Sequence, residues 1–379
     1  MQYELTEEQE TLRKSIRELA QGVIAPRAAE IDEKAEFPVD IWEQLAKYGW
    51  LSLVIPEEYG GTGAATLTTC VVVEEIAKVC ASSALILAVH SLGSTPINIA
   101  GNHEQKSRYF PKMATGENLA AFALTEPGAG SDASGLGTLA VLEGDHYRLN
   151  GTKCFISNGG VAEIYSVFAM TNPSVGTRGI SAFIVEKSFP GFKVGKLEHK
   201  MGIRANPTTE IIFEDCLVPK ENLLGKEGDG FRIAMQTLDK ARPGIGAQAV
   251  GIAQGAIDFA ANYAKQRVQF KAPLASLPTI QFKLADMAMH TEAARQLVYK
   301  AACMLDTGSK EVSKLSAMAK CFASDTAMWV TVEAVQILGG YGYMKEYPLE
   351  RMMRDAKITQ IYEGTNEIQR LVIARGVLS

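Results

Sequence analysis

The spacing of the apolar residues changes twice along the chain, and this double change limits the folds that the sequence can adopt. To about residue 115, apolar residues recur every three or four positions, as on one face of a helix. A Thr and a Gln three residues apart precede this pattern and predict a capping box, a common start of a helix. These signals are carried by Thr6 with Gln9, and by Leu12, Ile16, Leu19 and Val23. The first third of the chain is therefore predicted to be helical.

Between about residues 121 and 229 the pattern changes to short runs rich in β-branched and aromatic residues, bounded by Gly, Pro and Asn. These predicted strands lie at 147–150, 166–170, 179–185 and 210–214. From Gly230 onward, long helical patterns with few internal breakers return. The predicted helices lie at 235–265, 280–306, 312–340 and 365–377.

The order of helices, then strands, then helices argues against a doubly wound sheet, in which single strands and helices alternate. We predict an α+β fold that is mainly α, with three domains. These are an N-terminal helical domain (1–120), a small middle β domain (121–229) and a C-terminal four-helix bundle (230–379). A length of 379 residues with 47% hydrophobic content is enough to bury a large core.

Charge and composition exclude several classes of function. The 38 Lys and Arg residues against 43 Asp and Glu give a net charge of −5, and no Lys/Arg run is present, which disfavours binding to nucleic acid or to an anionic membrane. The cysteines and histidines have no metal-ligand spacing, so no metal site is predicted. The start MQYELTEEQE is not a signal sequence, and no run of 18 apolar residues occurs. A cytoplasmic protein without a membrane span is predicted.

Six short segments carry the strongest functional signal, because they occur together and in a fixed order. They are FALTEPGAGSD at 122–132, NGTK at 150–153, MGIR at 201–204, FED at 213–215, QILGG at 336–340 and IYEGTNEIQR at 361–370. In these segments, and over essentially its whole length, the chain resembles the acyl-CoA dehydrogenase family. Segments 234–239 and 281–288 are similar to the short-chain, butyryl-CoA dehydrogenase-like members. The resemblance implies the fold above, enclosing flavin adenine dinucleotide (FAD).

The resemblance implies that Glu363 is the catalytic base. Dehydrogenation of a thioester requires a base for the α-proton and a hydride acceptor, and since no side chain accepts hydride, the β-hydride would pass to flavin N5. In the family the backbone N–H of this glutamate and a flavin hydroxyl bind the thioester oxygen. Some relatives carry the base in the preceding bundle helix, but Ala241 stands at that position here. Apart from the motif, Glu363 would be interpreted as a carboxylate at a helix N-terminus.

The resemblance also implies a set of FAD-binding residues, some of which reach a cofactor bound mainly by a neighbouring subunit. The set is Phe122, Leu124, Thr125, Gly130, Ser131, Phe155, Ile156, Ser157, Arg267, Phe270, Gln281, Gln336, Gly339, Gly340, Thr365, Asn366 and Glu367. Taken alone, the 125–131 segment is a Pro/Gly turn, Phe155 a core aromatic and Arg267 a member of a surface ion pair. Phe155 also departs from the Trp that is usual in the family, and so lacks an indole N–H beside the flavin.

The implied substrate site consists of Ser131, Asp239, Arg242 and Gly364, which match residues around coenzyme A. Asp239 and Arg242 also have the spacing of an ion pair on a helix surface. The segment 81–96, which normally lines the acyl pocket, is one residue shorter than is usual in the family. We therefore add His90 as a candidate for contact with the acyl end, with a buried core histidine as the alternative.

The implied function is FAD-dependent α,β-dehydrogenation of a short-chain, or small branched or cyclic, acyl-CoA to the trans-2-enoyl-CoA. The implied partners are an electron-transferring flavoprotein and further copies of the chain in a homotetramer. The same site would serve an enoyl-CoA reductase in an anaerobe. Two rivals are a non-redox acyl-CoA lyase, which Glu363 opposes, and a nucleic-acid-binding relative, which the acidic balance opposes.

Overall fold

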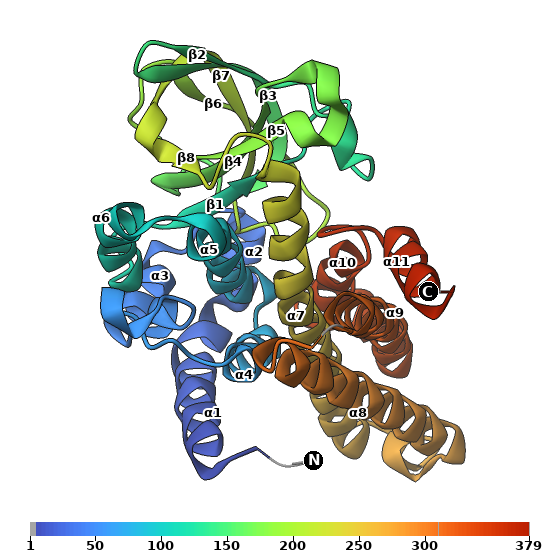
Figure 1. The fold of residues 1–379 in the computed structure, drawn as a ribbon. Helices are drawn as coiled ribbons and strands as arrows, with labels where there is room; N and C mark the ends of the chain where they lie inside the picture. Colours follow the sequence, from blue (N-terminus) through green and yellow to red (C-terminus); the bar gives the residue numbers. More distant parts are fainter. Residues whose placement is uncertain (1–4, 310, 379) are drawn as a thin grey trace.

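The computed structural model describes residues 5–309 and 311–378 and has the predicted order of a helical, a β and a second helical part (Figure 1). The predicted outer domain limits, residues 1 and 379, lie outside the described residues. Helix α1 starts at the predicted capping box, where the Gln9 N–H donates to Thr6 Oγ1 and the Thr6 N–H donates to Gln9 Oε1. The helices of the N-terminal part are α1 Glu7–Leu19, α2 Ala28–Lys34, α3 Val39–Lys47, α4 Thr66–Ala77, α5 Ala81–Ala100 and α6 His103–Ala114.

Helix α5 runs through the core and supports the sheet. By length and hydropathy it would be able to cross a membrane, but most of its residues are buried inside the protein. At Gly93 it touches strand β1 (Ala120–Ala123): a Cβ on Gly93 would lie 2.6 Å from the Ala121 nitrogen. The Gly93 carbonyl also accepts a hydrogen bond from Ser166 Oγ at 2.7 Å. Glycine permits this close approach of helix and strand.

The middle part is an eight-stranded sheet at the top of Figure 1. Its strand order is β6-β7-β3-β2-β4-β5-β8, and β1 pairs with β4 in parallel. Strands β4 and β5 are buried along nearly their whole length. The four predicted runs fall within β3, β4, β5 and β7, apart from one residue at the start of β5. The remaining strands are β2 Leu139–Glu143, β3 His146–Ser157, β4 Ile164–Met170, β5 Ile180–Glu186, β6 Phe192–Leu197, β7 Thr208–Pro219 and β8 Leu223–Leu224.

The C-terminal part is a helical bundle in which α7, α8, α9 and α10 pack together and α11 lies on α9. Its helices are α7 Gly230–Gln266, α8 Pro278–Asp306, α9 Val312–Leu338, α10 Leu349–Thr359 and α11 Asn366–Leu378. The prediction missed α10, a helix of 11 residues in which Leu349, Met352 and Ala356 face the core between charged residues. The other four helices agree with the predicted ones to within a few residues.

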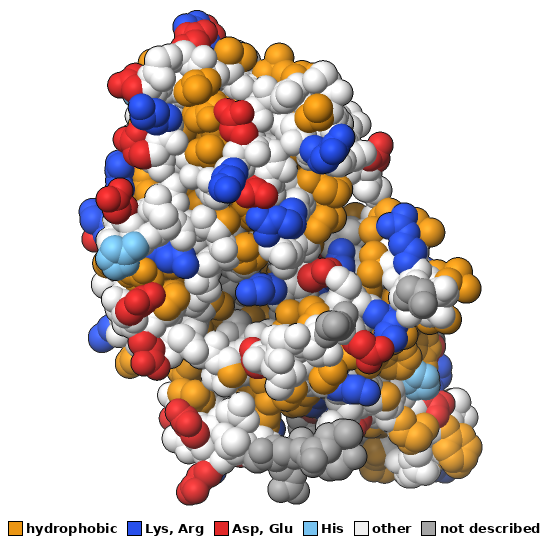
Figure 2. Space-filling model, in the orientation of Figure 1, with side chains coloured by type: hydrophobic (Ala, Val, Ile, Leu, Met, Phe, Trp, Pro, Cys, Tyr) orange, Lys and Arg blue, Asp and Glu red, His pale blue; other side chains and the backbone are white. Residues whose placement is uncertain are grey.

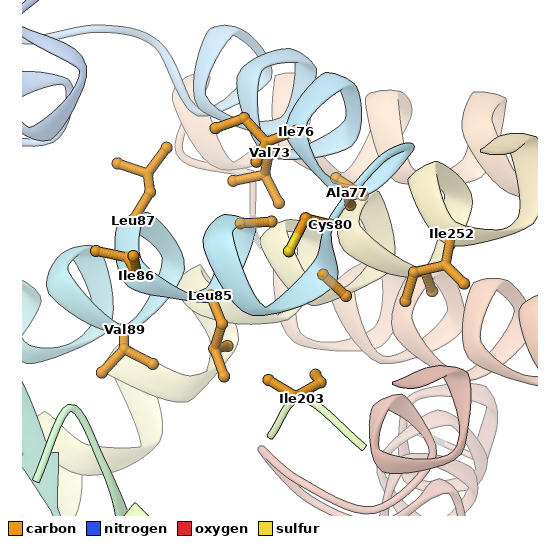
Figure 3. Packing of buried hydrophobic residues seen from close by; sticks show 14 of the residues in the cluster. Val73, Ile76, Ala77, Cys80, Leu85, Ile86, Leu87, Val89, Ile203 and Ile252 are labelled. Carbon is orange, nitrogen blue, oxygen red and sulfur yellow. The ribbon is translucent and has the colours of Figure 1, made fainter. Parts of the chain in front are cut away.

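One apolar core joins the two helical parts (Figure 3). Val73 and Ile76 of α4, Leu85 of α5 and Ile252 of α7 belong to this core, and all four are buried. Ile203, from the loop between β6 and β7, enters the same core. A loop of the sheet thus packs directly against the helices.

That loop forms a polar junction with α2 and α10. Arg354 donates to both carboxylate oxygens of Asp32, at 3.2 and 2.7 Å, and to the Met201 carbonyl at 2.9 Å. The N–H of Ile203, whose φ is +47°, donates to Asp355 at 2.5 Å. Burial raises the pKa of Asp355 to about 6. Each of the three parts therefore contributes to one set of hydrogen bonds.

As domain limits we propose those of the sequence, 1–120, 121–229 and 230–379. The second limit coincides with the start of α7 at Gly230, and the first falls after the opening residue of β1.

On the face that Figure 2 shows, acidic and basic side chains are interspersed.

Candidate active site

Glu363 lies in the short loop between α10 and α11, and the loop has an unusual backbone. Glu363 has φ +52° and Gly364 has φ +93°, so two successive residues are left-handed. This conformation is strained for a glutamate and natural for a glycine. The Gln369 side chain stabilises it by donating to the Glu363 carbonyl at 3.2 Å and to the Gly364 carbonyl at 2.9 Å. The Asn366 N–H closes the loop by donating to the Gln360 carbonyl at 2.9 Å.

The Glu363 carboxylate is in a desolvated position. Its Oε2 atom is buried and has no hydrogen-bond partner among the described residues. Burial raises the pKa of Glu363 to about 7, and the positive charges of Lys320 and Arg242 oppose that rise. A carboxylate that ionises near neutral pH is suited to general-base catalysis.

Arg242 and Asp239 form the ion pair that their spacing on α7 suggests, with Nη1 and Oδ1 2.5 Å apart. The pair is not an ordinary surface pair, because Arg242 is buried. Burial lowers the pKa of Arg242, and the charges of Asp239 and Glu363 oppose that effect. Asp239 also accepts a hydrogen bond from Ser313 at the start of α9. The pair therefore holds the Arg242 guanidinium in a fixed position close to Glu363.

The predicted FAD loop follows β1 and lies beside the end of β3. Thr125 is half-buried and Ser131 is exposed, whereas Leu124 and Ile156 are buried. A Cβ on Gly130 would meet no atom within 4 Å. The Cys154 N–H donates to the Thr125 carbonyl at 2.9 Å and holds the two segments together. The loop is thus held in a fixed position, with open space beside its backbone at Gly130.

Lys153 and Glu126, which the sequence analysis did not select, support this loop from inside. Lys153 Nζ lies 2.6 Å from Glu126 Oε1 and donates to the Leu124 carbonyl at 3.1 Å. Burial alone would raise the pKa of Glu126, but Lys153 and the backbone N–H groups of Gly137 and Thr138 leave it lowered. In the sequence, the available signal was that Glu126 and Lys153 are charged residues within two segments that are rich in buried residues.

Phe155 points away from the core, which excludes its alternative interpretation as a core aromatic. Its φ is +57°, and it lies where the register between β3 and β7 shifts between Lys153 and Ile156. The bulge turns the ring outward and leaves the residue 65% exposed. The half-buried Ser157 follows at the end of β3. Phe122, on β1, has its ring 5.0 Å from that of Phe168.

A second group of predicted FAD residues lies at the other end of α7. Arg267, Gly339 and Gly340 line a hollow of about 520 Å³ together with Tyr263 and Tyr341. Arg267 stacks on the Tyr341 ring at 5.3 Å, and no carboxylate pairs with it among the described residues. Phe270, in a turn with φ +53°, is 89% exposed. Gln281 and Gln336 are exposed nearby, in the first turn of α8 and the last turn of α9.

Two predicted site residues are turned inward. Asn366 is buried, and its side chain bonds Ser324 at 2.9 Å and Asp325 at 2.7 Å, so its part in FAD binding stays a prediction. His90 is wholly buried, and its Nδ1 accepts from the Ala120 N–H at 3.1 Å. This contact favours the core alternative for His90. Thr365 and Glu367 remain accessible at the start of α11.

The sequence analysis also missed Lys320 of α9. The residue is buried, and its Nζ donates to the Gly364 carbonyl at 2.9 Å. Burial lowers the pKa of Lys320 to about 8, against the charge of Glu363. The available signal was a lysine on the same face of α9 as the small residues Ser316 and Ser324.

Models of three protein domains match the chain in order. Residues 6–117 match the N-terminal, 121–216 the middle and 228–378 the C-terminal domain of acyl-CoA dehydrogenase. Among curated proteins, the chain is 54% identical to an acyl-CoA dehydrogenase of Bacillus subtilis, with 99% of each chain covered. It is 51% identical to a short-chain-specific acyl-CoA dehydrogenase of Clostridium acetobutylicum, again with 99% of each covered. It is 53% identical to an acryloyl-CoA reductase (NADH) of Anaerotignum propionicum, covering 100% of this chain and 96% of that one.

Solved structures agree with these matches. The fold superimposes with a TM-score of 0.98 on butyryl-CoA dehydrogenase from Megasphaera elsdenii, at 49% identity and full coverage of both chains. The same TM-score, at 50% identity and full coverage, is found with a structure from work on the electron transferring flavoprotein of Acidaminococcus fermentans. An acyl-CoA dehydrogenase of Bacillus anthracis complexed with FAD gives 0.92, at 39% identity, covering 99% of this chain and 67% of that one.

Proposed function

The chain belongs to the acyl-CoA dehydrogenase family, and on that premise we propose that it removes hydrogen from the α and β carbons of a short-chain acyl-CoA. It is a flavin-dependent oxidoreductase whose cofactor is FAD. The observation that carries the proposal is the desolvated Glu363 carboxylate, with a pKa of about 7, in the left-handed loop before α11.

The residues around Glu363 and the 122–131 loop fit a flavin. The backbone at Gly128 and Gly130 faces open space, and the Phe155 ring is turned outward beside the loop. Thr125, Ser131 and Ser157 would donate hydrogen bonds from this edge, with Phe155 as apolar cover. A bound flavin supplies the hydride acceptor for the β-carbon.

Glu363 would remove the α-proton. Its Oε2 atom lacks a hydrogen-bond partner in the described part of the chain, so it can accept a proton without first breaking a bond. Displacement of water by an acyl chain would raise its pKa further and strengthen it as a base. The fixed loop geometry leaves the Glu363 N–H available to the thioester oxygen. Enolate charge would be stabilised by that donor and by the positive charge of Arg242.

Coenzyme A would lie along α7 and the exposed Ser131, with Arg242, Asp239 and Gly364 as its contacts. Arg242 is the strongest candidate, because it is buried and preorganised by Asp239. We leave His90 out of the proposed substrate site, since its Nδ1 is engaged in the core.

Two hydrogen bonds beside Glu363, which together form a polar bridge, support the proposal that the substrate has a small acyl group. The Tyr362 hydroxyl donates to Gln248 Oε1, and Gln248 Nε2 donates to the Ala81 carbonyl at 3.0 Å. Gln248 is wholly buried on α7. The bridge links the residue next to Glu363 to the first residue of α5 and fills the space between α7 and α5 with a side chain. The curated relative from Clostridium acetobutylicum is named as short-chain specific.

Assembly of several chains, which we propose to be a homotetramer, would complete the FAD site. Arg267 directly follows the last residue of α7 and lies 19 residues beyond Gln248, which at 1.5 Å per residue is about 28 Å from the helical turn that contacts Tyr362. Arg267, Phe270, Gln281, Gln336, Gly339 and Gly340 therefore lie far from the Glu363 of their own chain. The exposed Phe270 and the hollow beside it suit contact with the cofactor half held by a neighbour.

The electron acceptor that we propose is an electron-transferring flavoprotein, in keeping with the Acidaminococcus fermentans structure. A second candidate function is reduction of a small enoyl-CoA, favoured by the 53% identity to an acryloyl-CoA reductase. Both directions use the same base and the same substrate site.

Anaerobic bleaching of the flavin tests the proposal. The purified enzyme is mixed with butyryl-CoA, and with longer, branched and cyclic acyl-CoA esters, while the flavin absorbance is recorded. We expect rapid bleaching by butyryl-CoA and a loss of at least ~100-fold in rate in Glu363→Gln with the flavin still bound. A Glu363→Gln variant that bleaches at the wild-type rate would exclude Glu363 as the base.

A further inference from the structure

Lys320 is a buried lysine directly beneath the loop that carries Glu363. Its side chain is wholly enclosed, and its Nζ donates to the Gly364 carbonyl and to Asn366 Oδ1, both at 2.9 Å. Among the described residues, no carboxylate oxygen lies within 4 Å of this ammonium. A buried charge without a paired counterion costs several kcal/mol unless something nearby requires it.

The two acceptors do not require a charge. A carbonyl and a carboxamide oxygen would be satisfied by a neutral donor, such as a glutamine or serine side chain. The anion that gains most from the ammonium is the Glu363 carboxylate, one residue from Gly364, whose Oε2 atom has no hydrogen-bond partner within residues 5–309 and 311–378. Burial destabilises both the Lys320 ammonium and the Glu363 carboxylate, and the attraction between their opposite charges offsets this destabilisation.

We propose that Lys320 is a positioning residue for the reaction, which fixes the left-handed Glu363–Gly364 turn through the Gly364 carbonyl and keeps the Glu363 carboxylate ionised. The inference rests on the proposed function, in which Glu363 is the base. The hydrogen bond to Gly364 orients the loop, and the positive charge compensates the carboxylate. Lys320 itself touches neither substrate nor cofactor.

The other charged groups around Glu363 do not replace this role. From α7, Arg242 faces the carboxylate, but it is already paired with Asp239. From α9, Asp325 is negative and pairs with Arg370 at 2.7 Å, and Cys321 is a buried thiol. On the loop itself, the Tyr362 hydroxyl is bonded to Gln248. Lys320 is therefore the cation near Glu363 that has no carboxylate partner of its own among the described residues.

The test compares the pH dependence of single-turnover flavin bleaching by butyryl-CoA in three variants of the flavin-loaded enzyme. Lys320→Gln keeps a donor but removes the charge, and Lys320→Arg keeps the charge. Ser324→Ala is the matched control, because it removes a neutral hydrogen bond to Asn366 in the same cluster. We expect the acid limb of Lys320→Gln to move upward by about one pH unit or more, because an opposite charge nearby lowers a carboxyl pKa by that amount. The limbs of the other two variants should stay at the wild-type pH.

A wild-type acid limb in Lys320→Gln would overturn the proposal, even if that variant were less stable. Infrared difference spectra of wild type against Glu363→Gln give a second readout, the pH at which the Glu363 carboxyl loses its proton. That pH should rise in Lys320→Gln. Failure of the proposed function is separately visible, since Glu363→Gln would then bleach at the normal rate.

If Lys320→Gln alone does not fold, the double variant Lys320→Gln/Glu363→Gln tests the same charge relation by thermal unfolding at pH 8. We expect the double variant to fold, because no buried carboxylate then lacks its cation. A double variant that also fails to fold would overturn the charge compensation and leave Lys320 as a packing residue.

Discussion

The ammonium of Lys153 lies 2.6 Å from a carboxylate oxygen of Glu126, and the Lys153 side chain is wholly buried. Removing one partner of such a pair leaves an uncompensated charge in the interior. We expect Lys153→Met to lower the free energy of unfolding by about 3–5 kcal/mol and to release FAD, because Glu126 supports the 122–131 loop. Chemical denaturation and the flavin-to-protein ratio measure both effects.

Two further variants sharpen this prediction. Lys187→Met is the control, since Lys187 also bonds a backbone carbonyl, that of Gly160 at 2.7 Å, but is partly exposed. It should retain FAD. The double variant Lys153→Met/Glu126→Gln should recover part of the lost stability, and a double variant weaker than Lys153→Met would contradict the account.

Replacing Glu363 by Gln should stabilise the protein above neutral pH. The fold raises the pKa of Glu363 from 4.5 to about 7, so the ionised form is penalised in the folded state. Below pH 4.5 the carboxyl is protonated in both states and no penalty exists; above pH 7 the penalty is complete. We expect Glu363→Gln to gain about 2–3 kcal/mol at pH 8 and almost nothing at pH 4.5, allowing for the partial exposure of the residue.

Thermal unfolding of the flavin-loaded enzyme at the two pH values measures this gain. Glu8→Gln, an exposed glutamate on α1, serves as the control and should change little at either pH. An equal gain for Glu363→Gln at pH 4.5 and pH 8 would mean that packing, and not charge, is responsible.

A side chain on Gly364 should damage catalysis more than folding. At φ +93° an alanine is strained by about 1–2 kcal/mol, and its Cβ would lie 2.6 Å from the Gln369 nitrogen that holds the loop. We expect Gly364→Ala to lower kcat at least tenfold. Gly60→Ala is the matched control, because Gly60 has φ +87° with open space around it. Its kcat should be normal despite a comparable loss of stability.

Shortening Gln248 should widen the range of acyl chains. Gln248→Ala breaks the bridge from Tyr362 to the Ala81 carbonyl and frees volume beside the base. The ratio of kcat/KM for hexanoyl-CoA to that for butyryl-CoA should rise about tenfold, the effect of one or two methylene groups in an apolar pocket. Gln254→Ala, on the same helix but bonded to Asp258 and Arg295, should leave the ratio unchanged.

A charge at Phe270 should separate the subunits. The ring is 89% exposed in the single chain, which is typical of an aromatic at an interface. We expect Phe270→Glu to shift the mass measured by light scattering toward the monomer and to lower the FAD content. Tyr48→Glu, at an aromatic 59% exposed on the N-terminal part, should change neither quantity. Retention of a full assembly by Phe270→Glu would exclude this surface as the interface.

The sequence predicted the fold well where periodicity is strong and failed where a side chain's direction depends on distant residues. The long helices α7, α8 and α9 were placed to within a few residues, whereas α10 was missed because charged residues interrupt its apolar face. The motif containing Glu363 located the candidate base. It did not reveal that Asn366, three residues later, turns inward toward Ser324 and Asp325 of α9.

The roles of Lys320 and Gln248 could not be predicted from the sequence either. Each is separated by more than 40 residues from the loop that it touches, and neither has a neighbour pattern that differs from an ordinary helix. Only the packing of α7 and α9 against the α10–α11 loop brings them beside Glu363 and Tyr362.

The junction of Asp32, the 201–204 loop, Arg354 and Asp355 limits how such a protein can be recombined. A chimera that takes only its sheet from a relative would have to supply a glycine at position 202, because a Cβ there would lie 2.4 Å from the Arg354 carbonyl. It would also have to offer an N–H to Asp355, or leave that carboxyl buried without a donor. The contacts across the junction therefore determine which segments of this chain can be exchanged with a relative. A transferred segment must bring the residues that form its half of these contacts.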